Sequence, residues 1–131
     1  MTLSDDSIRC SPVFLSPGEF LICTKTLYNI NIDLDSMSVK WKIKGTDFFV
    51  APPLSYGDFI FAVTLKGCLS KIDKITGETQ SEIFLIEPVF NTPVGYKGKI
   101  FVVSVTGFMF SLTEDLIIMS KAVFISSSRK V

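Results

Sequence analysis

The chain repeats one pattern about every forty residues, and this repeat limits what it can fold into more than any other feature. In each copy a small residue precedes a proline, a Gly-polar-apolar step follows, and a second turn signal comes a few residues later. Self-similarity at this period indicates a stacked or radial repeat architecture. Because the repeat extends along the chain, it leaves no room for an independent catalytic domain. The copies show these features at Ser11-Pro12, Gly18-Glu19-Phe20 and Lys25-Thr26; at Ala51-Pro52, Gly57-Asp58-Phe59 and Lys66-Gly67; and at Thr92-Pro93, Gly98-Lys99-Ile100 and Thr106-Gly107.

Composition places the chain among ordinary globular proteins. Of its 131 residues, 47% are hydrophobic and 20% are charged, which argues against wholesale disorder. The 13 basic and 13 acidic residues cancel, so the chain lacks the positive field that holds nucleic acid or an anionic membrane surface. We therefore expect no nucleic acid and no membrane among its partners. The 12 Phe residues, together with Ile and Val, favour strands over helices.

The sequence is typical of a cytoplasmic protein. Residues 1–6 are polar and acidic where a secretory signal would be basic and then apolar. The longest apolar runs, such as Phe59 to Val63 and Leu116 to Met119, are too short to span a bilayer. Three scattered cysteines suggest reduced thiols, although a bridge between two of them stays open. These cysteines are Cys10, Cys23 and Cys68.

The second copy gives the clearest prediction of secondary structure. Strands are expected at 54–56, 59–64, 68–73 and 78–85, because each of these segments is rich in β-formers or alternates apolar and polar residues. The turn residues Gly57-Asp58, Lys66-Gly67 and Lys74 to Gly77 separate them. Four short antiparallel strands joined by tight turns predict one small meander sheet.

The other two copies follow the same plan less closely. In the first copy we expect strands at 20–24, 27–33 and 39–43, with a turn at 35–37. In the third copy we expect strands at 100–105 and 108–112 and a turn at 113–115. The segment 116–119 then lacks the expected lead-in, and 114–124 is the only stretch with an ambiguous helical period. Residues 123–127 resemble the start of a fourth copy.

We interpret the chain as all-β, with about three four-stranded antiparallel blades of a β-propeller at about 10–50, 51–91 and 92–126. A β-helix normally has shorter coils, and a sandwich has no reason to repeat its turns at a fixed period. Because a propeller typically closes with about 4–8 blades, three blades leave the ring incomplete. Three interpretations follow, because an incomplete ring leaves apolar faces open. We favour a fragment of a larger propeller. The other two are a protein that assembles with copies of itself and a chain that is poorly soluble alone.

Specific residues resemble quinoprotein (PQQ)-like propeller repeats. Asp73 and Thr76-Gly77 match the A-x-D-x-x-T-G-x-x-x-W signature of that family. Asp33 and Trp41 form a weaker second match, with Ser36-Met37 where Thr-Gly is expected. The segment 90–94 looks like the F-S-S-P-V step of such blades.

Within this superfamily, the stretch from Phe49 to Leu112 is most similar to the C-terminal propeller of acyl-CoA synthetase family member 4, also called beta-alanine-activating enzyme or aminoadipate-semialdehyde dehydrogenase. In that family an adenylation domain and a phosphopantetheine carrier precede the propeller. The resemblance therefore implies activation chemistry outside this chain.

Candidate sites have simpler structural explanations. Paired carboxylates could bind a hard cation, but they are better explained as turn residues. The chain has no His, which excludes a Ser-His or Cys-His pair within it, and the cysteines lack zinc-site spacing. No glycine pattern for binding phosphate is present. The carboxylate pairs are Asp33 with Asp35 and Glu114 with Asp115.

Two single residues leave alternatives open. Trp41 could be an exposed binding anchor, but packing between blades is favoured. Cys68 lies near Lys66 and Lys71, which could make it reactive, but a small strand residue is favoured. We predict no catalytic residue, no cofactor and no metal. The positions that we expect to carry the repeat structurally are Pro12, Pro52, Pro93, Asp33, Asp73, Gly77 and Trp41.

The expected function is a noncatalytic scaffold or interaction segment, from a multidomain enzyme that activates an amino or fatty acid as an adenylate. Its expected partners are the remaining blades or domains of a parent protein, other copies of itself, or another protein. The alternatives are a fragment of a PQQ-dependent dehydrogenase and a short propeller protein that assembles its own ring.

Overall fold

A computed structural model of the chain describes residue 8 and residues 10–124. This part of the chain forms twelve strands and no helix, and so it contains no helix long and apolar enough to cross a membrane. The strands form three four-stranded antiparallel sheets, numbered sheet 1 to sheet 3 in chain order. They are β1 (Val13–Ser16), β2 (Glu19–Cys23), β3 (Thr26–Asp33) and β4 (Ser36–Lys44) in sheet 1; β5 (Leu54–Tyr56), β6 (Phe59–Val63), β7 (Cys68–Asp73) and β8 (Thr79–Phe84) in sheet 2; and β9 (Val94–Tyr96), β10 (Lys99–Val103), β11 (Phe108–Thr113) and β12 (Ile118–Val123) in sheet 3.

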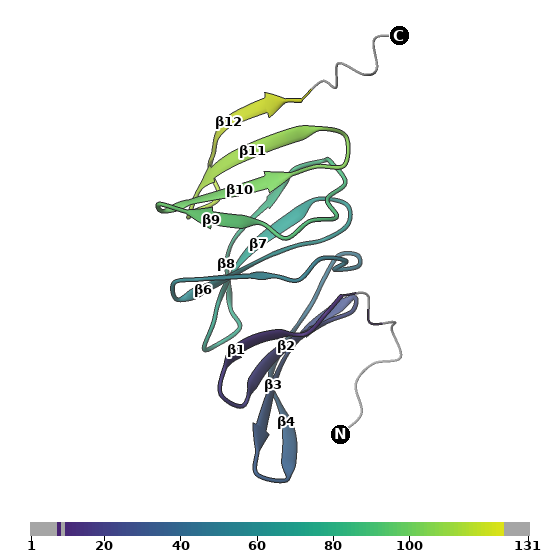
Figure 1. Cartoon of the computed structure of the whole chain (residues 1–131), viewed down its shortest axis with the longest axis vertical. Helices are drawn as coiled ribbons and strands as arrows, with labels where there is room; N and C mark the ends of the chain where they lie inside the picture. Colours follow the sequence, from purple (N-terminus) through teal and green to yellow (C-terminus); the bar gives the residue numbers. More distant parts are fainter. Residues whose placement is uncertain (1–7, 9, 125–131) are drawn as a thin grey trace.

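Each sheet is a meander in which consecutive strands are hydrogen-bonded neighbours. Figure 1 shows the three sheets following one another along the long axis of the molecule, with sheet 2 between the other two. The predicted fold class, all-β with about three four-stranded antiparallel sheets, is therefore confirmed.

Sheet 2 follows the prediction most closely. β5 and β7 cover the predicted residues, and β8 lies within the predicted segment 78–85. β6 ends one residue early because Thr64 belongs to the turn. The N–H of Thr64 donates to the Cys68 backbone oxygen at 2.9 Å, and the Thr64 hydroxyl accepts the Cys68 N–H at 3.1 Å.

Two details of the other copies are wrong in the prediction. The turn between β3 and β4 lies at 34–35 rather than 35–37, because Asp33 pairs directly with Ser36 and Leu34 closes the hairpin at φ 52°. In the third copy, the ambiguous stretch 114–124 supplies a complete fourth strand, β12, which pairs with β11 across a register shift. The predicted start of a further copy, 123–127, lies outside the described residues beyond Phe124.

The turn between the second and third strands carries the same side-chain device in every sheet. A buried hydroxyl accepts the N–H of a residue two or four positions later, at 2.9 Å for Thr24, 3.1 Å for Thr64 and 3.0 Å for Ser104. Such bonds satisfy backbone donors that the turn would otherwise bury without a partner. The same kind of hydrogen bond therefore stabilises the turn between the second and third strands of each sheet, although this bond spans two residues in sheet 1 and four in sheets 2 and 3.

Each sheet has a forward face toward the next sheet in the chain and a backward face toward the preceding one. Side chains alternate between these faces along every strand. Strand pairing places matching positions on each forward face, and in sheet 1 Leu15, at the register shift of β1, packs on the core beside them. These forward-face residues are Val13, Leu15, Leu21, Cys23 and Leu27 in sheet 1; Leu54, Tyr56, Phe61, Val63 and Leu69 in sheet 2; and Val94, Tyr96, Phe101, Val103 and Met109 in sheet 3.

The core consists of two clusters, one in each space between sheets. In the first, the forward face of sheet 1 packs on Ile60, Ala62 and Ile72 from the backward face of sheet 2. In the second, the forward face of sheet 2 packs on the backward face of sheet 3. Burying these apolar faces provides the main driving force for stacking the sheets. The backward-face residues of sheet 3 are Ile100, Val102, Phe110 and Leu112, all 2% exposed or less.

Candidate functional site

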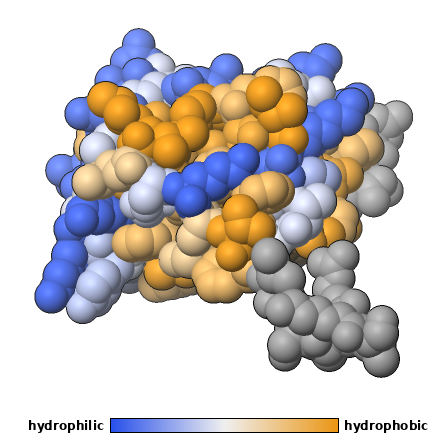
Figure 2. Space-filling view, turned by 90° about the horizontal axis from the view of Figure 1, so that it is seen from above, coloured by the Kyte–Doolittle hydropathy of each residue, from blue (hydrophilic) through white to orange (hydrophobic). Residues whose placement is uncertain are grey.

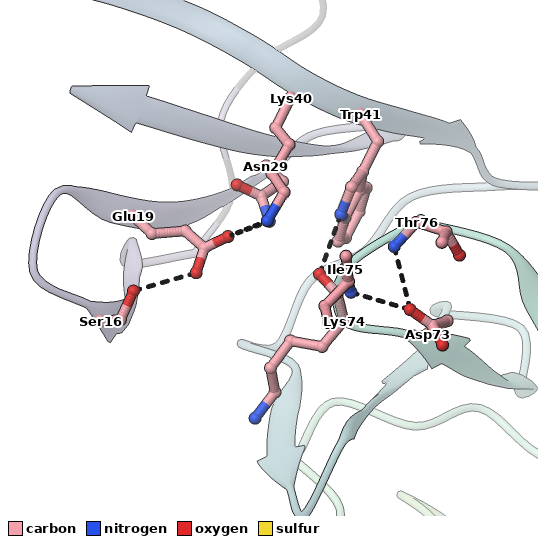
Figure 3. Close-up of polar contacts among 9 residues, drawn as sticks. All are labelled: Ser16, Glu19, Asn29, Lys40, Trp41, Asp73, Lys74, Ile75 and Thr76. Carbon is pink, nitrogen blue, oxygen red and sulfur yellow. Dashed lines mark hydrogen bonds and ion pairs between the residues drawn. The ribbon is translucent and has the colours of Figure 1, made fainter. Parts of the chain in front are cut away.

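Trp41 lies between sheet 1 and sheet 2. It comes from β4, is 8% exposed, and belongs to the first core cluster. Its indole Nε1 donates a hydrogen bond to the backbone oxygen of Lys74 at 3.1 Å, as Figure 3 shows. A Cβ built on Gly77 would lie 2.6 Å from Cγ of the indole, so only glycine leaves room for the ring. Trp41 is thus a contact between sheets rather than an exposed anchor.

Asp73 shapes the turn that receives Trp41. One of its carboxylate oxygens accepts the N–H of Ile75 at 2.8 Å and that of Thr76 at 2.9 Å (Figure 3). These backbone hydrogen bonds, the one from Thr76 first, hold the pKa of Asp73 below its ordinary value. Gly77 follows at φ 77°, a left-handed conformation that glycine adopts without strain. The carboxylate thereby fixes the turn that presents the Lys74 oxygen to the indole.

A polar network lies on sheet 1 beside this contact. The Glu19 carboxylate accepts hydrogen bonds at 3.0 Å from Ser16, Asn29 and Lys40. Burial alone would raise the pKa of Glu19, but these donors outweigh it and hold the pKa below its ordinary value. Asn29 is fully buried, and its Oδ1 has no hydrogen-bond partner.

In the structure the predicted repeat positions fall into three groups. Asp73, Gly77 and Trp41 meet at one contact, whereas Asp33 closes an exposed hairpin in which its backbone oxygen accepts the Ser36 hydroxyl at 3.0 Å. The three prolines each stand just before the first strand of a sheet, where a missing N–H removes no ladder bond. These prolines are Pro12 before β1, Pro52 before β5 and Pro93 before β9.

One of the paired carboxylates takes part in an ion pair. Asp115 reaches the Lys71 ammonium at 3.3 Å, and that ammonium also lies 4.1 Å from the centre of the Phe59 ring. Among residues 8 and 10–124, no three His, Cys, Asp or Glu side chains gather where they could hold a metal ion. In this structure Asp115 therefore acts as a pairing group for Lys71.

The three cysteines are all free thiols. Burial, and secondly the nearby Glu82 carboxylate, raise the pKa of Cys68, so the neighbouring lysines do not produce a reactive thiolate there. The Cys10 thiol and burial raise the pKa of Cys23, which is fully buried in the first core cluster. The structure therefore favours the expected role of Cys68 as a small strand residue.

The contact between sheets 2 and 3 is built differently from the Trp41 contact. Strand pairing puts Ser81 of β8 at the position that Trp41 occupies in β4. The turn of sheet 3 instead contributes Leu116, which is 4% exposed, belongs to the second core cluster and stands at φ 64°. The bulky side chain thus lies on the strand at the first contact and in the facing turn at the second.

Tyr56 contributes a second set of interactions to the same contact. Its hydroxyl oxygen accepts the Gly98 N–H at 2.7 Å. A Cβ on Gly95 would lie 2.5 Å from Cδ1 of the Tyr56 ring, so the ring needs a glycine beneath it. Sequence reasoning missed Tyr56, although its spacing of about forty residues from Tyr96 was visible in the repeat.

The forward face of sheet 3 is open. Its residues line an apolar groove of about 450 Å³, with Asn91 and Thr92 at one end. Val94, Tyr96 and Val103 are 58%, 59% and 40% exposed, while Phe61, Val63 and Leu69 on sheet 2 are at most 2% exposed. Viewed from the sheet 3 end of the stack, the surface shows hydrophobic areas crossed by a band of hydrophilic side chains (Figure 2). This face is the candidate functional site.

Comparisons with known proteins support the fold. No protein-family model and no curated protein sequence matches the chain. Its structure is similar to BamB from Moraxella catarrhalis, with a TM-score of 0.75 and 16% identity. It is also similar to a europium-containing methanol dehydrogenase (0.75 and 13%) and to quinohemoprotein alcohol dehydrogenase ADHIIG from Pseudomonas putida HK5 (0.76 and 13%).

These alignments include 92%, 97% and 97% of this chain but 38%, 27% and 22% of those proteins. The chain thus spans well under half the length of each. At such identities the likeness shows the fold alone: the three sheets are arranged as blades of a β-propeller.

Proposed function

We propose that this chain is a noncatalytic scaffold and interaction segment of a larger β-propeller. The observation that carries the proposal is the forward face of sheet 3, which leaves Val94, Tyr96 and Val103 exposed at positions that sheet 2 uses for packing. Monomeric soluble proteins rarely leave an extended apolar patch open unless it binds something. Stacked repeats bury such faces against their neighbours, so this face is suited to further packing.

The finer proposal concerns the parent protein. The resemblance of the Asp73 turn and of segment 49–112 to acyl-CoA synthetase family member 4 supports a multidomain enzyme that activates an amino or fatty acid as an adenylate. In such a parent, this segment would aid substrate presentation or partner docking, and the chemistry would lie outside the chain. A cytoplasmic location belongs to the same proposal and rests on the sequence expectation for the three thiols.

A second candidate is a segment of a PQQ-dependent dehydrogenase, which two of the similar structures suggest by fold alone. Such an enzyme holds its quinone cofactor with a hard cation on convergent acidic ligands. The described residues gather no such ligand set, so they do not fit this group. A third candidate is a short propeller that closes a ring with copies of itself.

Size-exclusion chromatography with light scattering on the purified chain tests the scaffold proposal. We expect self-association at micromolar concentration, because the open face of sheet 3 exposes apolar surface. A discrete ring of a few copies would favour the self-assembling alternative. A sharp monomer peak with cooperative unfolding would contradict the proposal, since the open face would then have no tendency to bind.

A further inference from the structure

The contact between sheets 2 and 3 has a residue-by-residue counterpart on the open side of sheet 3. Strand pairing matches Val94 to Leu54, Phe101 to Phe61 and Met109 to Leu69. Tyr96 likewise takes the place of Tyr56 at the end of the first strand. The open face therefore continues an existing interface rather than presenting a new kind of surface.

We propose that the forward face of sheet 3 seats the backward face of a further four-stranded sheet, which carries a glycine beneath Tyr96. This inference rests on the proposed function and names the occupant of the same surface. Its core is the Tyr56 contact, in which one glycine makes room for the ring and a second donates its N–H to the hydroxyl. Tyr96 is 59% exposed and lines the groove, so its ring and hydroxyl are accessible for an equivalent contact.

The backward face of sheet 3 shows what the occupant must look like. It meets sheet 2 with Ile100, Val102, Phe110 and Leu112, all almost fully buried. The partner chemistry is therefore a sheet with branched aliphatic residues on its second strand and large apolar residues on its third. Its first strand needs glycine at the position of Gly95, because any Cβ there would clash with the tyrosine ring.

A second copy of this chain does not meet that requirement. Stacking in the same direction would bring its sheet 1 onto the open face, and strand pairing gives Phe14 of β1 the position of Gly95. Phe14 carries a bulky ring where glycine is needed. On the same backward face, Tyr28 and Ile30 are only 5% and 2% exposed, so these two side chains offer little accessible surface. The occupant is therefore a different sheet.

The test supplies such a sheet to the full chain. A copy of residues 85–124 is joined behind Val131 through a flexible Gly/Ser linker, which gives it a high effective concentration near the open face. Met109 of the original sheet 3 reports on the face through its oxidation by hydrogen peroxide, and the appended copy carries Met109→Leu so that only the original methionine is followed. Met37, at 55% exposure in sheet 1, is the internal reference. The matched control is the same protein with Gly95→Phe in the appended copy only.

We expect the appended copy to slow Met109 oxidation by about tenfold. This ratio follows if the face is covered in about nine molecules of ten, because Met109 is then accessible only in the remaining one. The oxidation of Met37 should not change, and the Gly95→Phe control should restore the fast rate. The oxidation is followed below the concentration at which the chain self-associates, and protection there that survives in the control would mean that the face is covered without the glycine contact, which overturns the proposal. Equal rates of Met109 oxidation in the unextended chain, the extended chain and the Gly95→Phe control would overturn it too.

A second measurement does not depend on folding of the appended copy. In the unextended chain, Tyr96→Lys with Val103→Lys should at least halve the binding of a hydrophobic dye. Ile75→Lys with Phe84→Lys, which changes two exposed apolar residues of sheet 2, should leave it nearly unchanged. The reverse order would show that the open face is not the apolar docking surface. Self-association with no seating of the appended sheet would refute this inference and leave the scaffold proposal intact.

Discussion

The two contacts between sheets fill equivalent space with opposite arrangements of side-chain bulk. Between sheets 1 and 2, Trp41 on the strand packs over Gly77 in the facing turn. Between sheets 2 and 3, the strand carries Ser81 and the facing turn carries the buried Leu116. The repeat thus keeps strand register and turn position, while the large residue changes sides. Core volume can be kept when bulk moves from one partner to the other.

Their polar contacts differ in the same way. The first contact has an indole N–H that donates to the Lys74 oxygen. The second has the Tyr56 hydroxyl, which accepts the Gly98 N–H, and the pairing of Lys71 with Asp115. Each contact keeps one direct hydrogen bond between a large aromatic side chain and the backbone of the next sheet. Such bonds orient the sheets, while the apolar faces supply most of the stability.

The largest effect is expected at Trp41. Trp41→Ala should lower the free energy of unfolding by about 3–5 kcal/mol, because it empties a buried aromatic site. Denaturation by urea, followed by circular dichroism, measures this change. The matched substitution Ser81→Ala at the equivalent position should change it by less than about 1 kcal/mol. A neutral Trp41→Ala would mean that the indole contributes nothing to the contact.

Exchanging the bulk at the second contact sharpens the comparison. Ser81→Trp alone should destabilise by about 1–3 kcal/mol through overpacking against Leu116. Leu116→Gly alone should cost about 2–5 kcal/mol through the cavity that it leaves, less the strain relieved at its positive φ. Together they recreate the arrangement of the first contact, so their effects should couple favourably by about 1–2 kcal/mol. Strict additivity would show that the two positions do not share one space.

The Asp73 turn predicts a dependence on pH that is specific to the first contact. Its folded-state pKa lies below the ordinary value of 3.8, so its stabilising effect is present above that value and is lost as the pH falls through the folded pKa. Asp73→Asn should therefore lower the melting temperature near neutral pH, and the difference from the native chain should shrink in acid. Asp33→Asn, in the exposed hairpin, is the control. A difference that stays constant with pH would contradict the role of the carboxylate charge.

The smallest effect is expected at Asp115. Its side chain is 79% exposed, so its pair with Lys71 is largely screened by solvent. Asp115→Asn should destabilise by less than about 1 kcal/mol, because the Lys71 ammonium keeps its place over the Phe59 ring. Thermal unfolding at low and high salt measures this, with the smaller effect at high salt. A loss as large as that of Trp41→Ala would mean that the ion pair, rather than the apolar face, holds sheet 3.

The sequence predicts the architecture well because its turn chemistry is local. Gly77 and the hydroxyls of Thr24, Thr64 and Ser104 fix turns through contacts within a few residues. It predicts less well where the outcome depends on a neighbouring sheet. Nothing near Leu116 in the chain indicates that it replaces a tryptophan, since the space it fills is created by sheet 2.

The incomplete ring predicts an open apolar face, but the residues that are exposed on it are harder to predict for the same reason. Val94, Tyr96 and Val103 are the same kinds of residue as their partly or fully buried counterparts Leu54, Tyr56 and Val63, so local pattern cannot distinguish a covered face from an open one. The forty-residue register does identify these positions once the strand pairing is known.

Because forward and backward faces carry different residues, the stack has a polarity, and this polarity limits the symmetry of any assembly that extends it. A twofold dimer would place identical faces against each other and could not repeat the existing contacts. Extension with those contacts is head-to-tail, so it either turns through a full circle and closes or continues without end as a fibre. The unequal faces of a four-stranded sheet thus decide between a finished ring and a filament.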